Sequence, residues 1–161
     1  MVGIGYDIHP LVPHRKLFLG GIEIDFPFGL AGHSDGDVLL HAICDALLGA
    51  ANLGDIGKHF PPDDQRYKNI SSLKLLKSTG NLLKDSGHKV EHIDTIVIAE
   101  KPRILDHVDR MKAAIASSLE IPVDAISIKG KTNEGMGDIG KGKAIAAWAI
   151  CAIGRTDVTP E

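Results

Sequence analysis

Hydrophobic residues follow two different spacings along the chain, and each spacing predicts a different kind of element. Short apolar runs rich in β-branched residues predict strands over residues 17–24, with a bend at a Gly-Gly pair, and over residues 94–100 and 125–131. Three longer runs, with apolar residues three and four positions apart, predict helices: residues 37–54, 69–87 and 103–122. The chain therefore alternates between strands and helices.

The order of these elements predicts the fold class. Alternating strands and helices indicate an α/β (α+β) sandwich, in which a mixed β-sheet has helices packed on one face. The apolar segment 143–154 fits either element, because its length and alanine content favour a helix whereas its unbroken apolar character favours a buried strand. No repeat or linker interrupts the 161 residues, so we expect a single domain over residues 1–161.

Composition and charge exclude several classes of partner. A net charge of −3 argues against nucleic acid or an anionic membrane, because both attract positively charged proteins. No apolar run approaches the roughly 20 residues that a membrane-spanning helix needs, and the N-terminus lacks the pattern of a signal peptide. Cys44 and Cys151 lie in apolar runs, which is typical of buried thiols in a reducing compartment. We expect a cytoplasmic protein with neither nucleic acid nor membrane as partner.

The segment GYDIH places Asp7 and His9 two positions apart near the start of the chain. In a strand, side chains at i and i+2 leave the same face of the backbone, so these two side chains would suit one metal ion. The alternative is that Asp7 begins a turn and that His9, which precedes Pro10, is solvated. The pair alone leaves both interpretations open.

The helix predicted from residue 37 carries a second group of polar side chains. Asp37, His41 and Asp45 fall at i, i+4 and i+8 in an otherwise apolar segment, so they share one line along the helix. One interpretation is a narrow exposed edge. The other is that His41 binds a metal ion and that a neighbouring carboxylate orients its ring. Adding His41 to Asp7 and His9 gives three ligands with one position left open, which is the pattern of a catalytic zinc site.

Three loops have the composition of phosphate-binding segments. HSDGD precedes the helix: Ser34, Asp35 and Asp37 suit helix capping, and a helix start also receives phosphate oxygens well. GDIGKHFPPDD, residues 54–64, is either a binding loop or a solvated connection. The glycine-rich loop 133–142 matches G-x-x-x-x-G-K, but Gly142 stands where a Walker loop needs Ser or Thr. It can still hold a diphosphate and its divalent ion with Thr132, Glu134 and Lys141.

Taken together, the chain resembles the 2-C-methyl-D-erythritol 2,4-cyclodiphosphate synthase family of the non-mevalonate isoprenoid pathway. The similarity extends nearly end to end, through GIGYDIHPL, GLAGHSDGDVLLHAICDALLGAANLGDIGKHFP and KTNEGMGDIGKGKAIAAWA. The joint presence of GYDIH and GHSDGDVLLHAICDALLGA is highly specific. The resemblance implies an enzyme that closes a cyclic diphosphate on a CDP-linked methylerythritol 2-phosphate and releases CMP.

The resemblance also implies roles for individual residues and an assembly. Asp7, His9 and His41 would bind Zn²⁺, and Glu134 would help hold a second divalent cation, Mg²⁺ or Mn²⁺, on the substrate diphosphate. His33 and Thr132 would stabilise the transition state. The implied assembly is a chorismate-mutase-like homotrimer with active sites between subunits, in which segment 143–154 is a strand. A bacterial cytoplasm is the expected location, or a plastid stroma if a transit peptide was removed.

Substrate contacts are implied at positions in every one of these motifs. Asp55 matches a ribose-binding position and residues 99–105 match the cytidine pocket. The full set is Asp7, Ile8, His9, His33, Ser34, Asp55, Ile56, Gly57, Phe60, Pro61, Pro62, Asp63, Asp64, Ala99, Glu100, Lys101, Pro102, Arg103, Ile104, Leu105, Lys131, Thr132, Asn133, Glu134, Asp138 and Lys141.

Four of these positions depart from the usual family pattern: Pro62, Lys131, Asp138 and Lys141. They fall in phosphate and nucleotide loops, outside the metal triad.

Two other functions are compatible with the same candidate metal and nucleotide residues. A zinc phosphohydrolase acting on nucleotides would activate water at the three-ligand site. A non-catalytic nucleotide- or metal-binding module would bind without turnover.

Overall fold

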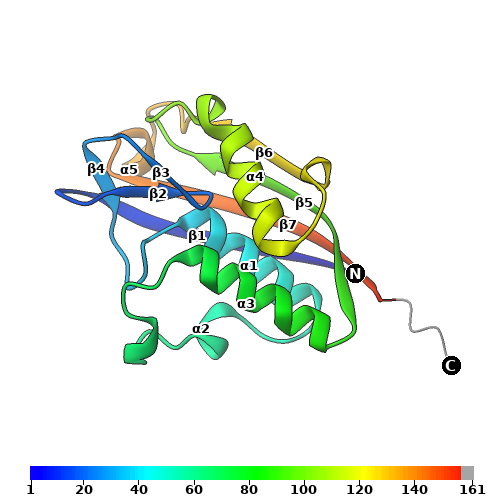
Figure 1. The fold of residues 1–161 in the computed structure, drawn as a ribbon. Helices are drawn as coiled ribbons and strands as arrows, with labels where there is room; N and C mark the ends of the chain where they lie inside the picture. Colours follow the sequence, from blue (N-terminus) through cyan, green and yellow to red (C-terminus); the bar gives the residue numbers. More distant parts are fainter. Residues whose placement is uncertain (157–161) are drawn as a thin grey trace, which may run out of the picture.

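The computed structural model describes residues 1–156, so residues 157–161 of the predicted domain lie outside the described range. Its centre is a five-stranded sheet with the order β4-β1-β7-β5-β6. Strand β1 is antiparallel to β4 and β7, and β5 is antiparallel to β7 but parallel to β6, so the sheet is mixed. Helices α1, α3 and α4 cover one face of the sheet (Figure 1). The predicted fold class is confirmed.

The strands follow the predicted segments, with some shifts of their ends. Segment 17–24 forms the separate two-stranded sheet β2–β3, and the strand predicted over 94–100 begins earlier, at His88. The bounds are β1 Val2–Pro13, β2 Leu17–Leu19, β3 Ile22–Ile24, β4 Phe28–Leu30, β5 His88–Ile98, β6 Ile126–Lys131 and β7 Ala144–Arg155.

The three predicted long helices are present. The helix predicted over 103–122 begins as a 3-10 turn, so its α-helical part starts at Val108. The bounds are α1 Val38–Ala50, α2 Ile56–His59, α3 Ser72–Asp85, α4 Val108–Leu119 and α5 Gly137–Gly140, with 3-10 turns at Gln65–Tyr67, Ile104–His107 and Val123–Ala125. No helix within residues 1–156 is both long and apolar enough to cross a membrane.

Segment 143–154, which the sequence left ambiguous, forms the central strand β7. One set of alternate side chains faces the helices and is buried: Ile145, Ala147, Ala149, Cys151 and Ile153. The other set includes Trp148 and Ile150, which are large, apolar and half exposed. Because apolar residues occupy both faces, the period of two is invisible in the sequence.

Helix α1 packs unusually close to β1, and two glycines make this possible. A Cβ added to Gly3 would lie 2.0 Å from the Ala46 carbonyl oxygen, and one added to Gly5 would lie 1.9 Å from the Ala42 oxygen. Any larger side chain at either position would push the helix away from the strand. Positions 3, 5, 7 and 9 share this face of β1, so the two glycines set how far Asp7 and His9 lie from the helix.

The opposite face of the sheet carries exposed apolar side chains, and no described element covers it. Residue exposure there reaches 63% at Ile4 and 49% at Ile150. Tyr6 and Trp148 are in contact across β1 and β7, with ring centroids 4.6 Å apart and ring planes tilted by 43°. A single chain thus leaves a large apolar surface exposed, which is a feature of interaction faces.

Both cysteines match the sequence prediction of buried thiols. Cys44 lies in α1 and Cys151 in β7, and both are free and buried. Burial raises the pKa of the Cys44 thiol to about 12. Both therefore belong to the apolar layer between sheet and helix.

Gly5→Ala tests the close contact between β1 and α1. Because its methyl group would overlap the Ala42 carbonyl oxygen, we expect the free energy of unfolding to fall by about 3 kcal/mol. The measurement is urea unfolding. Gly49→Ala is the matched control, since Gly49 lies in α1 and no other described element comes within 4 Å of an added Cβ. That variant should gain about 0.5–1 kcal/mol. Equal stability of Gly5→Ala and the natural chain would contradict the packing argument.

Candidate metal centre and nucleotide pocket

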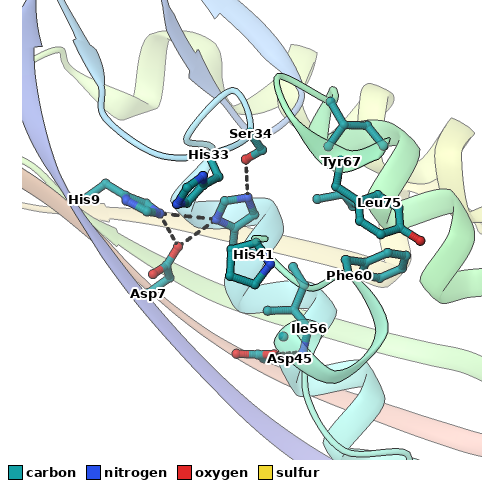
Figure 2. Close-up of a pocket in the computed structure, with 13 residues that line it drawn as sticks. Asp7, His9, His33, Ser34, His41, Asp45, Ile56, Phe60, Tyr67 and Leu75 are labelled. Carbon is teal, nitrogen blue, oxygen red and sulfur yellow. Dashed lines mark hydrogen bonds and ion pairs between the residues drawn. The ribbon is translucent and has the colours of Figure 1, made fainter. Parts of the chain in front are cut away.

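Asp7 and His9 extend from β1 toward the helical layer. The strand continues past both residues, so the alternative of a turn at Asp7 is wrong. Their side chains are about one quarter exposed, with relative areas of 26% and 22%. The His9 Nε2 atom lies 2.9 Å from Asp7 Oδ2. The two side chains therefore converge on one point beside α1, as Figure 2 shows.

His41 completes the group from the first turns of α1. Its Nδ1 atom lies 2.9 Å from Asp7 Oδ2 and 3.4 Å from His9 Nε2 (Figure 2). The three atoms thus form a triangle with edges of 2.9, 2.9 and 3.4 Å. One nitrogen from each ring and one carboxylate oxygen are close enough together to hold a single divalent metal ion. The structure brings together the three predicted ligands.

Asp37, His41 and Asp45, which were predicted to lie in one row along the helix, make separate contacts. Asp37 is the N-cap of α1: its carboxylate accepts hydrogen bonds from the backbone N–H groups of Leu40, Gly20 and Gly21. It is fully buried, and burial raises its pKa to about 6. Its role is therefore to begin the helix and tie it to the β2–β3 turn, not to orient the His41 ring.

Asp45 lies one helical turn beyond His41 and lines the same pocket. Its Oδ1 atom accepts a hydrogen bond of 2.7 Å from the Ile56 backbone N–H, which fixes the start of α2 against α1. Burial raises the pKa of Asp45. This contact brings the loop of residues 54–64 to the metal-binding triad.

The outer nitrogen of the His41 ring contacts two hydroxyl groups. Nε2 lies 2.9 Å from Ser34 Oγ and 3.0 Å from Ser72 Oγ. Ser72 also contacts the carboxylate of Asp35, with 2.5 Å between Oγ and Oδ1. The carboxylate connected to His41 on this side is therefore Asp35, through Ser72.

Hydrogen bonds within the triad shift two pKa values in opposite directions. Burial alone would raise the pKa of Asp7, but hydrogen bonds to His41 and His9 outweigh it and lower this pKa from 3.8 to about 2. Burial alone would lower the pKa of His41, but the bond to Asp7 outweighs it, and the pKa rises above 6.5. Without a metal ion, carboxylate and imidazolium stabilise each other.

A pocket of about 270 Å³ opens beside the triad, with an apolar wall from the loops after α1 and from the start of α3 (Figure 2). Most of the predicted substrate-contacting residues in the first half of the chain line it. The lining residues are Asp7, His9, His33, Ser34, His41, Asp45, Ile56, Gly57, Phe60, Pro62, Tyr67, Ile70 and Leu75.

A second pocket, of about 500 Å³, lies at the carboxyl ends of the parallel strands β5 and β6. Parallel strands end at the same edge of a sheet, so the loops that follow them meet there. Glu100 joins these loops: its Oε1 accepts hydrogen bonds from the backbone N–H groups of Asn133 and Gly135. The lining residues are Ala99, Glu100, Pro102, Arg103, Ile104, Leu105, Val108, Ile128, Lys129, Gly130, Lys131 and Thr132.

The two pockets lie at the same level of the sheet but on different strands. Ile8 pairs with Ala146, Ala146 with Ile98, and Ile98 with Lys131, which places all four in one row across the sheet. Three strand spacings of about 4.8 Å separate β1 from β6, or about 14 Å. Among residues 1–156, no residue lines both pockets.

The remaining predicted contact residues lie outside these two pockets, as far as the described chain shows. Ile8 is on the opposite, exposed face of β1. Lys101 and Lys141 line a smaller pocket with Glu100. Asp55 and Asp64 cap short helical turns, and Thr132 donates a hydrogen bond of 3.1 Å to Glu134. The others in neither pocket are Pro61, Asp63, Asn133 and Asp138.

Several pocket residues were absent from the sequence prediction. Tyr67, Ile70 and Leu75 form part of the apolar wall of the pocket. Tyr67 and Ile70 precede α3 and Leu75 lies in its first turn, and the three belong to no recognisable motif. Ser72 was not predicted, and Asp35 was considered only as a cap. The sequence did contain a signal for the close approach of the helix to the first strand. Gly3 and Gly5 lie at every second position before Asp7 and His9, so all four share one face of that strand.

Comparison with known proteins identifies close relatives over nearly the whole chain. A family model described as the YgbB family matches residues 1–154. A protein of Alkaliphilus oremlandii named 2-C-methyl-D-erythritol 2,4-cyclodiphosphate synthase is 53% identical over 152 residues, which cover 94% of this chain and 97% of that protein. One of Chloroherpeton thalassium with the same name is 55% identical over the same shares of the two chains.

Two solved structures are also similar to this chain in sequence and in fold. The bifunctional IspDF of Campylobacter jejuni is 37% identical with a TM-score of 0.94, covering 99% of this chain and 43% of that one. The CDP complex of IspF from Plasmodium falciparum is 33% identical with a TM-score of 0.85, covering 97% and 96%.

The pKa shifts predict a stability maximum in the metal-free protein. The lowered pKa of Asp7 makes its contribution complete above about pH 4 and lost as the pH falls toward 2. The raised pKa of His41 makes its contribution complete below about pH 6.5 and lost as the pH rises through the folded value. Urea unfolding of chelator-treated protein should therefore give the highest free energy of unfolding between about pH 4 and pH 6.5. Asp7→Asn should remove this maximum, whereas Asp25→Asn, an exposed control, should keep it. A maximum that persists in Asp7→Asn would contradict the assignment.

Proposed function

The chain belongs to the YgbB family, whose relatives compared above are 2-C-methyl-D-erythritol 2,4-cyclodiphosphate synthases, and we propose that the pocket beside Asp7, His9 and His41 is its site of cyclisation. The enzyme converts 4-diphosphocytidyl-2-C-methyl-D-erythritol 2-phosphate into the 2,4-cyclodiphosphate and CMP, in isoprenoid precursor synthesis by the non-mevalonate pathway. An oxygen of the 2-phosphate attacks the phosphorus next to the erythritol. The bond from that phosphorus to the CMP oxygen breaks, so no water is consumed.

The triangle of ligand atoms is the observation that carries this proposal. A tetrahedral Zn²⁺ with bonds of about 2.0 Å places its ligands about 3.3 Å apart, close to the observed edges of 2.9 to 3.4 Å. Asp7, His9 and His41 would hold the ion, and a zinc ion held there would supply a Lewis acid for a phosphoryl oxygen of the substrate.

The chain's own residues position the reacting groups. Nucleophile and electrophile belong to one molecule, so holding its two phosphate groups in line supplies much of the rate. His33 and Ser34, which line the pocket, can donate hydrogen bonds to phosphoryl oxygens. The apolar wall at Ile56 and Leu75 faces the erythritol carbon atoms and excludes water from the phosphorus.

The pocket at β5 and β6 is proposed to hold the cytidine diphosphate part of the substrate. Its lining includes Ala99, Glu100 and residues 102–105 of the segment that the resemblance assigns to cytidine. Glu134, in its entrance loop, supplies a carboxylate for a second divalent cation, Mg²⁺ or Mn²⁺. The Thr132 hydroxyl donates to Glu134 in the ligand-free chain, and it would donate to the diphosphate instead once a cation occupies that carboxylate.

The assembly is proposed to be a homotrimer with each active site between two subunits. Two features support it: the metal pocket and the nucleotide pocket are separate within a chain, and the uncovered sheet face is apolar. Packing this face against other copies would remove Ile4, Trp148 and Ile150 from water. For location we propose the cytoplasm, as the relatives named above from Alkaliphilus and Chloroherpeton are bacterial proteins, or a plastid stroma after removal of a transit peptide.

His41→Ala tests the metal site and the reaction together. With the CDP-methylerythritol phosphate, zinc and Mg²⁺, the natural chain should release CMP and form a cyclic product detectable by mass spectrometry. His41→Ala should lose bound zinc and at least a hundredfold in activity, because one of three ligands is gone. His88→Ala, at the first residue of β5 and outside both pockets, is the control and should keep both. An open-chain product would indicate a hydrolase, and binding without turnover would indicate a binding module; either outcome overturns the proposal.

Mixing two defective variants tests the site between subunits. His41→Ala damages the metal pocket and Glu134→Gln damages the loop of the nucleotide pocket, so each variant alone should be nearly inactive. In mixed trimers refolded from equal amounts, about one quarter of the sites combine two undamaged halves, and activity should recover to about that fraction. Sites within single chains would all carry a lesion, so absence of recovery in mixtures that sedimentation shows to be trimers would contradict the shared site.

A further inference from the structure

The His41 ring has polar partners on both sides, and only one side belongs to the metal triad. Nδ1 faces Asp7 and His9, whereas Nε2 faces Ser34 Oγ at 2.9 Å (Figure 2). Nε2 also lies 3.0 Å from Ser72 Oγ. Ser72 is fully buried, at the first position of α3. A buried hydroxyl at this place needs partners of defined polarity, because water cannot replace them.

The hydroxyl proton of Ser72 already has an acceptor. Ser72 Oγ lies 2.5 Å from Asp35 Oδ1, a short contact typical of a hydroxyl that donates to a carboxylate. An ionised carboxylate can only accept, and a serine has one proton to give. Ser72 therefore meets the His41 ring only as an acceptor, and the proton between them is on Nε2.

We infer that Asp35 and Ser72 are positioning residues that keep the proton of the neutral His41 ring on Nε2 and so present the Nδ1 lone pair to a metal ion. This inference rests on the proposed metal site. Neutral imidazole has one protonated and one unprotonated nitrogen, and only the unprotonated one can be a ligand. Carboxylate, hydroxyl and imidazole form one chain of bonds whose direction is set by Asp35, 37 residues from Ser72 in sequence.

Neighbouring contacts hold this chain of bonds in place. Arg15 donates to the Ser34 carbonyl oxygen at 2.6 Å, and the Asn69 backbone N–H donates to the His33 carbonyl oxygen at 2.9 Å. Asp35 Oδ2 accepts the Ser72 backbone N–H at 2.8 Å. The loop before α1 and the loop before α3 are thus joined beside the ring. This rigidity keeps the ring from turning when a ligand enters.

Asp35 also has a purely structural contact, which the experiment must separate from the proposed role. Its bond to the Ser72 backbone N–H caps α3 in place of Ser71, whose side chain makes no capping bond within the described residues. Ser72→Ala removes only the hydroxyl and leaves this backbone bond. Ser71→Ala is the matched control, one residue earlier.

The test is zinc affinity, measured by competition with a chelator on otherwise intact protein. We expect Ser72→Ala to bind zinc about tenfold more weakly than the natural chain, since Ser34 remains as a partial acceptor, and Ser71→Ala to bind as the natural chain does. Thermal unfolding confirms that both variants are folded. Equal affinity of Ser72→Ala and Ser71→Ala would overturn the inference. A natural chain that binds no zinc would instead overturn the proposed metal site.

A double-mutant cycle and a spectrum test the direction of the bonds. If Asp35 acts through Ser72, Asp35→Asn combined with Ser72→Ala should weaken zinc binding no more than Ser72→Ala alone, whereas additive losses would overturn the inference. In nitrogen NMR spectra of the zinc-loaded natural chain, the His41 proton should reside on Nε2 and exchange slowly, and exchange should be faster in Ser72→Ala. A proton found on Nδ1 would overturn the inference even if Asp35→Asn fails to fold.

Discussion

The close contact between β1 and α1 is the constraint on which the rest of the site depends. Gly3 and Gly5 allow the carbonyl oxygens of Ala46 and Ala42 to approach the strand backbone, and the same strand face then carries Asp7 and His9. His41 follows from the same helix and reaches Asp7 at 2.9 Å. A wider gap between strand and helix would leave these three side chains too far apart to share one ion, whatever their identity.

Each carboxylate around this contact forms hydrogen bonds with its own set of partners. Asp37 begins the helix by accepting three backbone N–H groups, Asp45 anchors α2, and Asp35 reaches His41 through Ser72. Buried polar groups without partners cost free energy, so each carboxylate has its own role. The site therefore combines a rigid apolar base with a polar rim in which few alternative arrangements exist.

The position of the proposed nucleotide pocket follows from sheet topology. Among the strands of residues 1–156, only β5 and β6 are parallel neighbours, so the loops that follow them meet at one edge and form a hollow there. The metal pocket instead depends on an antiparallel strand and its covering helix. Two kinds of geometry on one sheet explain why the pockets lie on different strands and share no lining residue among residues 1–156. This separation within one chain supports the proposal that a complete active site needs a second chain.

The sequence by itself determined what local spacing can express: the helices, the strand character of most apolar runs, and Asp7, His9 and His41 as candidate metal ligands. It did not determine that segment 143–154 is a strand, because apolar residues on both faces conceal the period of two. Nor did it show that Asp37 serves the helix start while Ser72 reaches His41. Those contacts join residues far apart in the chain, and only the packing of α1 and α3 on the sheet decides which of them meet.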